Sequence, residues 1–319
     1  MSELTFRPAT LDDARVVADI DTEIDPDDAE DPQMLLHWWR LIESDHVVGR
    51  WIVSLAGEPV GYGRWDHPAW AKMPERFIRL QADLRPRART AERVSSLYER
   101  LESEARGEGA KRATTWAWET DALRIDALRS RGYREERRER FWELDLVKER
   151  ERITKLAAES RERMKKEGIR VLTLAEDTDP RTWEKLKRMS DEAESDVPTT
   201  VPHVAMESLD EWKKWFDSPG IHLDRSWIAR DGDDIVGISQ LAYPPERGEV
   251  ETDWTGTARK VRGRGVARAL KCETLMQAMA LGVKRVRTDN DSTNTPILHI
   301  NETMGYRRRP DMAQYLKEL

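Results

Sequence analysis

The amino-acid sequence predicts a mixed α/β fold built as two tandem domains. The chain has 319 residues, 38% of them hydrophobic, which suits two ordinary cores better than one. A weak internal repeat at a spacing of roughly 175 residues suits a duplicated domain, because a solenoid repeat is much shorter. Strand-like and helix-like patterns alternate within each half, as in layered folds. We expect a first domain at 1–147, a linker helix at 148–167 and a second domain at 168–319.

Two landmarks open each half. Leu4–Ala14 and Ile169–Pro180 both alternate as a strand does and lead into an acidic helix start. Arg50–Trp65 and Ser226–Leu241 both read as strand, tight turn and strand. Gly57-Glu58 is the turn signal in the first of these pairs.

A third landmark closes each half. Arg131–Leu146 and Met304–Leu319 each carry a glycine-tyrosine helix stop followed by a short extended run. Between the halves, Val147–Gly168 lacks proline and is rich in helix formers, with Ile153 and Met164 on an apolar stripe. This segment predicts the linker helix.

The charge balance argues against several classes of partner. Lys and Arg number 54 against 61 Asp and Glu, so the net charge of −7 offers no global field for nucleic acid or an anionic membrane. The single cysteine, Cys272, excludes an internal disulfide, and the N-terminus lacks the layout of a signal peptide. The histidines have no metal-ligand spacing, so we expect no metal. We expect a cytoplasmic monomer or homodimer.

The segment Gly248–Pro310 carries the informative chemistry. Glu251 and Asp253 lie on an alternating strand that ends at Gly256, where the ladder can relax into a bulge or splay. The loop that follows contains Gly263 and Gly265 and leads directly into a helical pattern. Without Cβ atoms, these glycines let a diphosphate approach the backbone N–H groups at a helix start. Six neighbouring cations could meet further phosphate: Arg259, Lys260, Arg262, Arg264, Arg268 and Lys271.

Other glycine loops fit this segment less well. A dinucleotide fingerprint needs a third glycine where the chain has Arg268, and the Gly-Lys-Ser/Thr of a Walker loop is absent. A loop that caps an ordinary helix without any ligand is the alternative reading of the glycines alone.

The run Lys260-Val261-Arg262-Gly263-Arg264-Gly265 resembles the pyrophosphate-loop motif Q/R-x-x-G-x-G/A of the GNAT superfamily of acetyl-CoA-dependent N-acetyltransferases. Thr255-Gly256 before it, and Asn290, Asn294, Asn301 and Met304-Gly305-Tyr306 after it, resemble one GNAT subgroup. The resemblance covers the second half and is dense over about 60 residues. It implies that each domain is a mixed, mostly antiparallel twisted sheet flanked by helices.

The resemblance also implies where acetyl-CoA, or another acyl-CoA, would bind. In this family the strand before the loop holds the pantetheine arm, and a splay towards the strand at Lys284–Thr288 admits the cofactor. The implied cofactor-binding residues are Thr255, Gly256, Thr257, Arg262, Gly263, Arg264, Gly265, Val266, Ala267 and Asn294.

An amine must lose a proton before it attacks a thioester, because its pKa of about 10 keeps it protonated at pH 7. Glu251 and Asp253 share one strand face, so one of them is the candidate base, and we favour Glu251. The alternative is a solvated or salt-bridged strand face. Many GNAT enzymes place a tyrosine acid where this chain has Asn301, which cannot act as an acid. Tyr306, Tyr243 or water would then protonate the thiolate, while Asn301 would bind the sulfur or the arm.

The first half has lost both glycines of the motif. Arg87-Ala88-Arg89-Thr90 aligns with Arg262-Gly263-Arg264-Gly265, so Cβ atoms occupy the space for a diphosphate. We expect a structural or substrate-shaping role for this half, although a loop rich in arginine could still hold a phosphate. Its tryptophans, such as Trp38 and Trp116, suit the core, or alternatively an aromatic substrate wall.

The sequence therefore predicts acetyl transfer from acetyl-CoA to a primary amine of a small molecule, in a ternary complex on the second domain. Asp196 either binds a substrate ammonium or marks a helix stop before Pro198. Two alternatives stay open: acetylation of a protein or peptide amine, which predicts an open acidic groove, and a non-catalytic acyl-CoA-binding scaffold.

Overall fold

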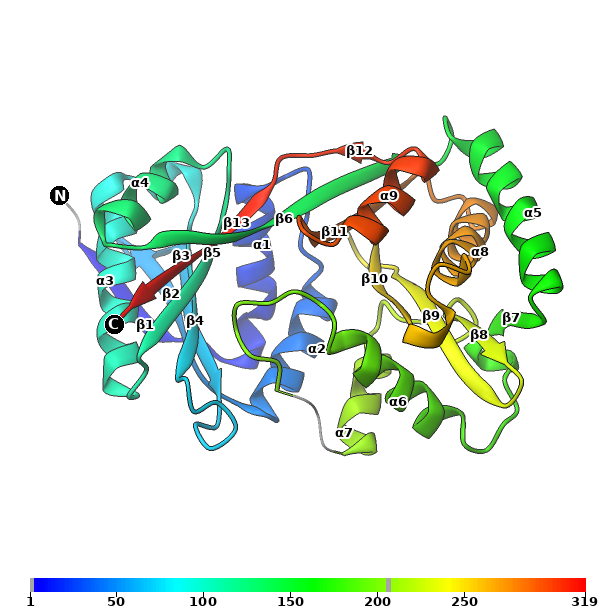
Figure 1. Ribbon diagram of the computed structural model, residues 1–319. Coiled ribbons are helices and arrows are strands. Elements are labelled where there is room, and N and C mark those ends of the chain that lie inside the picture. Colours follow the sequence, from blue (N-terminus) through cyan, green and yellow to red (C-terminus); the bar gives the residue numbers. More distant parts are fainter. Residues whose placement is uncertain (1–2, 205–207) are drawn as a thin grey trace.

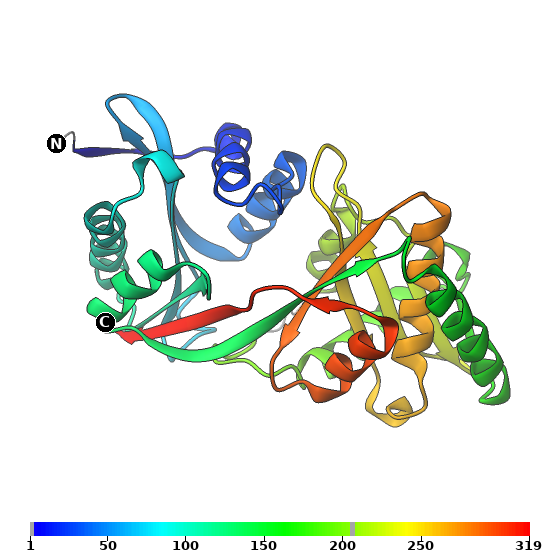
Figure 2. The same ribbon diagram turned by 90° about the horizontal axis from the view of Figure 1, so that it is seen from above.

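The computed structural model describes residues 3–204 and 208–319 and shows two α/β halves side by side (Figures 1 and 2). The strands form one continuous sheet in the order β1-β2-β3-β4-β5-β13-β6-β11-β10-β9-β8-β7, and β12 pairs with β6. Neighbouring strands are antiparallel except for β4 with β5 and β10 with β11. The predicted mixed and mostly antiparallel α/β fold is confirmed.

The first half contains β1 (Leu4–Pro8), α1 (Ala14–Ile24), α2 (Pro32–Glu43), β2 (His46–Leu55), β3 (Glu58–Pro68), β4 (Phe77–Leu84), α3 (Ala91–Gly107), β5 (Arg112–Trp118), α4 (Ala122–Ser130) and β6 (Arg134–Asp145). The hairpin of β2 and β3 turns on Ala56 and Gly57, which both have positive φ as a two-residue hairpin requires. The turn thus falls one residue before the predicted Gly57-Glu58, because Glu58 already pairs with Leu55.

The second half contains α5 (Arg150–Lys166), β7 (Ile169–Thr173), α6 (Thr182–Glu194), α7 (Leu209–Lys213), β8 (Trp227–Asp231), β9 (Asp234–Ala242), β10 (Val250–Thr257), α8 (Val266–Ala280), β11 (Arg285–Asp291), α9 (Thr295–Met304), β12 (Arg307–Arg308) and β13 (Met312–Glu318). Five one-turn 3₁₀ helices lie at Leu11–Asp13, Pro86–Ala88, Leu174–Glu176, Lys214–Asp217 and Arg259–Val261 within the described residues. No helix of the described residues is both long and apolar enough to span a membrane.

The halves exchange strands at their junction. The C-terminal strand β13 inserts between β5 and β6 of the first half, where Ala313 and Tyr315 join the hydrophobic core. The later part of β6 crosses in the opposite direction and pairs with β11, so that Trp142 and Leu144 join the core of the second half. Figure 2 shows β6 running from one half to the other, and β13 lying in the first half at the end of the segment that comes from the second half. The exchange ties the halves together, while the predicted domain boundaries stay a prediction.

Helix α5 occupies the segment predicted to be a linker helix, and it packs on the second half. Its residues Ile153, Ala157 and Met164 are buried, and they contact the cores that α8 and β7 contribute to. This helix therefore forms part of the wall behind the glycine loop.

The first half also contacts the second half through the start of α2. Asp31 Oδ1 accepts hydrogen bonds from the N–H groups of Gln33 and Met34, which caps α2. Its Oδ2 accepts from the N–H groups of Glu246 and Arg247, which belong to the loop between β9 and β10. One carboxylate thus fixes α2 to the strand pair that leads into the candidate site.

Candidate active site

A glycine-bearing loop joins β10 to α8. Gly263 and Gly265 have φ angles of +75° and +87°, in the left-handed region that residues with a Cβ atom rarely adopt. A Cβ atom added at Gly263 would meet nothing within 4 Å, so the space beside this residue is open. Gly265 is the N-cap of α8, and no side-chain hydrogen bond caps the helix there. The first N–H groups of α8 can therefore donate to an anion, which the helix dipole also favours.

The two strands beside this loop separate after a short paired stretch. β10 and β11 run parallel but are in register at only two positions, Val250 with Val286 and Glu251 with Arg287. Both strands continue well beyond these pairs. Backbone groups on the diverging edges have no partner on the facing strand, so they can hydrogen-bond an amide-containing arm inserted between them.

Most of the basic side chains in the loop are held in ion pairs. The pairs are Arg259 and Arg262 with Asp196, Lys260 with Asp234, and Arg264 with Glu167 and Asp231. Lys271 does not belong to this phosphate-facing set, and its inclusion was wrong. It is 2% exposed, and its Nζ lies 3.4 Å from Thr252 Oγ1, because it points from α8 into the protein interior.

Two other arginines are available beside the loop. Arg163 of α5 donates from Nη2 to Gly263 O at 3.0 Å, and its Nη1 lies 3.1 Å from the position of a Cβ atom on Gly265. Arg268, in the first turn of α8, makes no ion pair or hydrogen bond with any residue in the described ranges. The open glycine cradle, the uncapped helix start and these two cations fit a cofactor that carries a diphosphate.

Asp196 bridges two arginines of the loop. Its Oδ1 accepts from Arg259 Nη2 and its Oδ2 from Arg262 Nη1, both at 2.6 Å. These hydrogen bonds hold the pKa of the carboxyl below its usual value. Asp196 does not line the cavity that lies between the two halves. In this structure it positions the loop, and its contact with a substrate ammonium stays a prediction.

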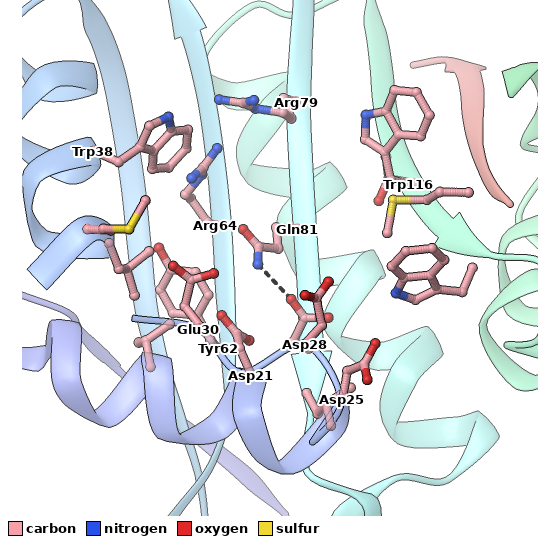
Figure 3. Close-up of a pocket in the computed structure, with 18 of the residues that line it drawn as sticks. Asp21, Asp25, Asp28, Glu30, Trp38, Tyr62, Arg64, Arg79, Gln81 and Trp116 are labelled. Carbon is pink, nitrogen blue, oxygen red and sulfur yellow. Dashed lines mark hydrogen bonds between the residues drawn. The ribbon is translucent and has the colours of Figure 1, made fainter. Parts of the chain in front are cut away.

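A cavity of about 590 Å³ lies between the two halves. Its lining comes largely from α1, α2, β3, β4 and β5 of the first half, while Glu251 and Asp253 of β10 contribute from the second half (Figure 3). The volume falls in the range of roughly 300–1,000 Å³ that is typical of small-molecule sites. Trp38, Trp116 and Trp118 line it, so these tryptophans form an aromatic side of the cavity, while their contact with a substrate stays a prediction.

Glu251 meets this cavity beside the opening between β10 and β11. Although its side chain is exposed to the cavity, atoms of both halves surround it on the other sides. Burial, followed by the nearby charges of Asp28 and Asp289, raises the pKa of Glu251 to about 8. A carboxyl with such a pKa is well matched to taking a proton near neutral pH.

Asp253 turns towards the same cavity through a β-bulge. The register of β10 against β9 shifts between Thr252 and Trp254, which re-aims the residue between them. Gln240 Nε2 donates to Asp253 Oδ2 at 2.5 Å, and burial raises the pKa of the Asp253 carboxyl. The structure therefore brings both candidate bases to one place, and a neighbouring amide engages only Asp253.

The candidate acids lie deeper in the protein than the two candidate bases. Asn301 is fully buried, and its Nδ2 donates to Asn290 Oδ1 at 2.7 Å, which joins α9 to β11. Asn301 Oδ1 has no partner among the described residues. Tyr306 is packed in the core with the Lys271 ammonium 5.4 Å from its ring centre, and burial raises the pKa of Tyr306 and lowers that of Lys271 to about 8. Tyr243 is not among the residues that line the cavity.

The other predicted cofactor residues cluster along the opening and the start of α8. Gly256 is buried where a Cβ atom would press on Trp254 and Ala193 at 3.0–3.1 Å. Thr255 Oγ1 hydrogen-bonds Ser239 Oγ at 2.8 Å, and Arg262 Nη2 donates to Thr257 O at 3.4 Å. Val266 and Ala267 form the first turn of α8, and Asn294 is the N-cap of α9. Their contacts with a cofactor stay predictions.

In the first half, an arginine links the two corresponding strands. Arg124 of α4 pairs with Asp83 of β4, and its Nη1 donates to Trp116 O of β5 at 3.4 Å. Arg89 pairs with Asp121 at the start of α4. An arginine thus bridges β4 and β5 at the place where β10 and β11 stand open. Counting from the glycine-tyrosine pairs that follow α4 and α9, the counterpart of Arg124 in the second half is Ile297.

The structure shifts the predicted alignment of the two loops by two residues. The 3₁₀ helices Pro86–Ala88 and Arg259–Val261 occupy equivalent places, so Thr90 and Glu92 stand where Gly263 and Gly265 stand. Thr90 Oγ1 accepts from the N–H of Arg93 at 3.3 Å and caps α3. Both glycines are still replaced by residues with Cβ atoms, and here a side chain occupies the helix start.

An Arg124→Leu variant is expected to lose about 3–5 kcal/mol of stability, because Asp83, which is 7% exposed, would keep a buried charge without its partner. The double variant Asp83→Leu/Arg124→Leu should recover most of this loss, because it removes both charges. Urea unfolding measures both. Equal stability of the wild type and the single variant would contradict the bridging role.

The comparisons with known proteins agree with this geometry. Residues 186–306 match the model of the Acetyltransferase (GNAT) family. The chain is similar in structure to a tandem GNAT protein from the clavulanic acid biosynthesis pathway, with a TM-score of 0.75 and 14% identity over 99% of this chain and 98% of that one. It is also similar to a GCN5-related N-acetyltransferase from Sphaerobacter thermophilus, with a TM-score of 0.70 and 17% identity over 99% and 95% of the two chains. No curated protein sequence matches the chain.

The solved structures show that the fold extends over both halves, and the family match falls on the half that carries the glycine loop and the open strands. The chain therefore has the tandem fold of these proteins over both halves, and residues 186–306 form a domain of the Acetyltransferase (GNAT) family.

Proposed function

We propose that the protein transfers an acetyl or related acyl group from acyl-CoA to a primary amine of a small molecule, with the active site in the second half. The observation that carries this proposal is the meeting of three features at β10. The strand begins beside the cavity at Glu251, opens away from β11, and ends at the glycine loop. An acyl donor and an amine acceptor can thus approach each other from opposite sides.

The diphosphate-binding role and the role of the base each have candidate groups. Acetyl-CoA, which GNAT proteins generally bind, supplies an activated acyl group when bound. The N–H groups at the start of α8, with Arg163 and Arg268, would hold its diphosphate. Glu251 would take the proton from the acceptor ammonium and leave a neutral amine beside the strand opening. Direct attack in a ternary complex would then form the C–N bond and break the C–S bond, and the CoA thiolate would take a proton from water and leave as the thiol.

The protein should bind acetyl-CoA at one site per chain, because Arg124 bridges the corresponding strands of the first half and both glycines of its loop are replaced. Isothermal calorimetry measures this stoichiometry, and mass spectrometry of an amine panel detects the N-acetylated product. Two sites per chain would contradict the inactive first half, while binding without turnover over the whole panel would favour the acyl-CoA-binding scaffold.

Acetylation of a protein or peptide amine is the second candidate, because the acidic lining of the cavity also suits a lysine side chain. A lysine-containing peptide in the same panel separates the two. A kcat/KM for the peptide above that for every small amine would favour the second candidate.

The pH profile of kcat/KM should rise by about tenfold per pH unit below pH 8 and level off above it. Burial raises the Glu251 pKa to about 8, so at lower pH this carboxyl is protonated and cannot accept a proton. Since kcat/KM reports the free enzyme, the profile should follow the free-enzyme pKa. A profile that levels off near pH 5 would contradict a role for Glu251.

A further inference from the structure

Apart from Asp253, which accepts a hydrogen bond from Gln240, the carboxylates that line the cavity fall into two groups. The carboxylates of the first group are paired with arginines: Asp83 and Asp121 with Arg124, and Asp28 with Arg287 at 2.5 Å. Those of the second group have neither an ion-pair nor a hydrogen-bond partner in residues 3–204 and 208–319: Asp21, Asp25, Glu30 and Glu251. The cavity therefore contains carboxyl groups that its own arginines do not pair, and a bound cation would favour their ionised forms.

The unpaired carboxylates lie on two sides of the cavity. Asp21 is near the end of α1, Asp25 is its C-cap, and Glu30 lies in the loop that leads to α2. Figure 3 shows these three side chains gathered at one end, away from Trp38, Arg64 and Arg79. Glu251 stands on β10 of the second half. The acidic first-half residues and the candidate base thus contact one space from different elements.

A buried hydroxyl gives a second, independent sign of a polar ligand. Tyr62 lines the cavity and is only 1% exposed, yet its hydroxyl has no hydrogen-bond partner among the described residues. Buried polar groups of this kind are nearly always satisfied in native proteins. Figure 3 places the Tyr62 ring beside Asp21 and Glu30. A ligand with hydrogen-bond donors at this end would satisfy the hydroxyl and the carboxylates together.

The other end of the cavity does not offer a comparable group of unpaired carboxylates among its lining residues. Arg64 and Arg79 both pair with Asp66, at 2.6 Å and 3.0 Å. The Arg64 guanidinium also covers the Trp38 ring at 4.2 Å, so this aromatic face is already occupied by a cation. The unpaired carboxyl groups are therefore concentrated near α1 and at Glu251.

We propose that the acceptor is a compact molecule with at least two amino groups, of which one reacts beside Glu251 and a second, as an ammonium, is held by Asp21, Asp25 and Glu30. This inference rests on the proposed function for the reacting amine. It assigns the first half a role in selecting the substrate. Ammonium–carboxylate contacts in such a partly enclosed site are stronger than neutral hydrogen bonds and would offset the crowding of like charges.

Burial and like-charged neighbours raise the pKa of two of these carboxyl groups. Burial, with the nearby charges of Asp28 and Asp31, raises the Glu30 pKa to about 7. Burial also raises the pKa of Asp21, with Asp83 and Glu30 as like-charged neighbours and Arg124 and Arg64 as opposing ones. A bound ammonium would favour the ionised forms of these carboxyls.

The test compares 1,4-diaminobutane with n-butylamine as acceptors for the full-length protein and acetyl-CoA. These amines have the same carbon chain and differ by one amino group. We expect kcat/KM to be about 10- to 100-fold higher for the diamine, which is the contribution of one or two charge-assisted contacts. Equal values, or a preference for the monoamine, would overturn the proposal while leaving acetyl transfer intact.

Variants locate the second ammonium. Asp21→Asn removes one unpaired carboxylate at constant shape and should lower the diamine-to-monoamine ratio of kcat/KM by about tenfold. Asp27→Asn is the matched control, because Asp27 is exposed in the loop that follows α1 and does not line the cavity. The control should keep the wild-type ratio. An unchanged ratio in Asp21→Asn would overturn the assignment to α1.

Binding measurements separate this inference from the proposed function. If neither amine is acetylated, calorimetry with 1,4-diaminobutane still reports on the cavity. Diamine binding that weakens about tenfold in Asp21→Asn, but not in Asp27→Asn, would support the cation site although acetyl transfer had failed. The absence of diamine binding to the wild type would overturn the cation site.

Discussion

A Gly263→Trp variant is expected to lose acetyl-CoA binding, with the affinity falling by at least about 100-fold, or roughly 3 kcal/mol. The space beside Gly263 is open to 4 Å, and it adjoins the uncapped first turn of α8. An indole ring would fill this space and shield the N–H groups that could hold a diphosphate. Isothermal calorimetry with acetyl-CoA measures the loss directly.

The control for this variant is Gly282→Trp at the other end of α8. Gly282 also has a positive φ, +84°, and nothing lies within 4 Å of a Cβ atom placed on it. Both variants therefore carry a similar backbone strain of about 1–2 kcal/mol, but only one blocks the loop. Gly282→Trp should bind acetyl-CoA as the wild type does. Wild-type affinity for acetyl-CoA in Gly263→Trp would show that the glycine loop does not bind the diphosphate, and the proposed acyl-CoA site would be wrong.

The sequence predicted the features that depend on local chemistry. Gly263 and Gly265 adopt the left-handed conformation that makes glycine useful in a phosphate loop, and α8 begins directly after them. Glu251 and Asp253 both line one cavity, although a bulge rather than simple alternation aims Asp253 there. The tandem α/β fold followed from the repeated order of strands and helices, which is the most regular signal in this chain.

Features that depend on which elements meet in space could not be predicted. Nothing in the alternation of Met312–Glu318 shows that this strand pairs with β5 of the other half, because strand patterns specify a face but not a neighbour. Arg163 lies on the segment interpreted only as a linker, and its contact with Gly263 depends on how α5 packs on α8. An arginine near the end of a helix that looks exposed gives no sequence signal for a contact with a glycine loop.

The acidic end of the cavity was missed for the same reason. Asp21 lies in an ordinary amphipathic helix, and Asp25 and Glu30 follow it in what looks like a solvated turn. They come to line a cavity between the halves because Asp31 hydrogen-bonds the loop between β9 and β10, and because Asp28 pairs with Arg287 of β11. The predicted alignment of the two loops was wrong by two residues. Because both glycines are replaced in the first half, its sequence contains no motif that fixes the position of the loop.

A Glu251→Gln variant is expected to lower kcat by about 10²–10⁴-fold, the usual contribution of a positioned general base. Glutamine keeps the shape of the side chain but cannot accept a proton. Because Glu251 lies at the cavity and not at the glycine loop, acetyl-CoA affinity should stay within about twofold of the wild type. Steady-state kinetics with 1,4-diaminobutane and calorimetry with acetyl-CoA measure the two quantities.

Asp253→Asn is the comparison that decides between the two carboxylates. The Gln240 amide already donates to Asp253, so this residue is held in place and is less able to swing towards an incoming ammonium. We therefore expect the smaller loss of kcat in Asp253→Asn, about tenfold or less, and a pH profile that still rises to about pH 8. In Glu251→Gln the rise should vanish, because the group whose pKa is raised to about 8 is gone. The reverse pattern, with the rise lost only in Asp253→Asn, would transfer the role of base to Asp253.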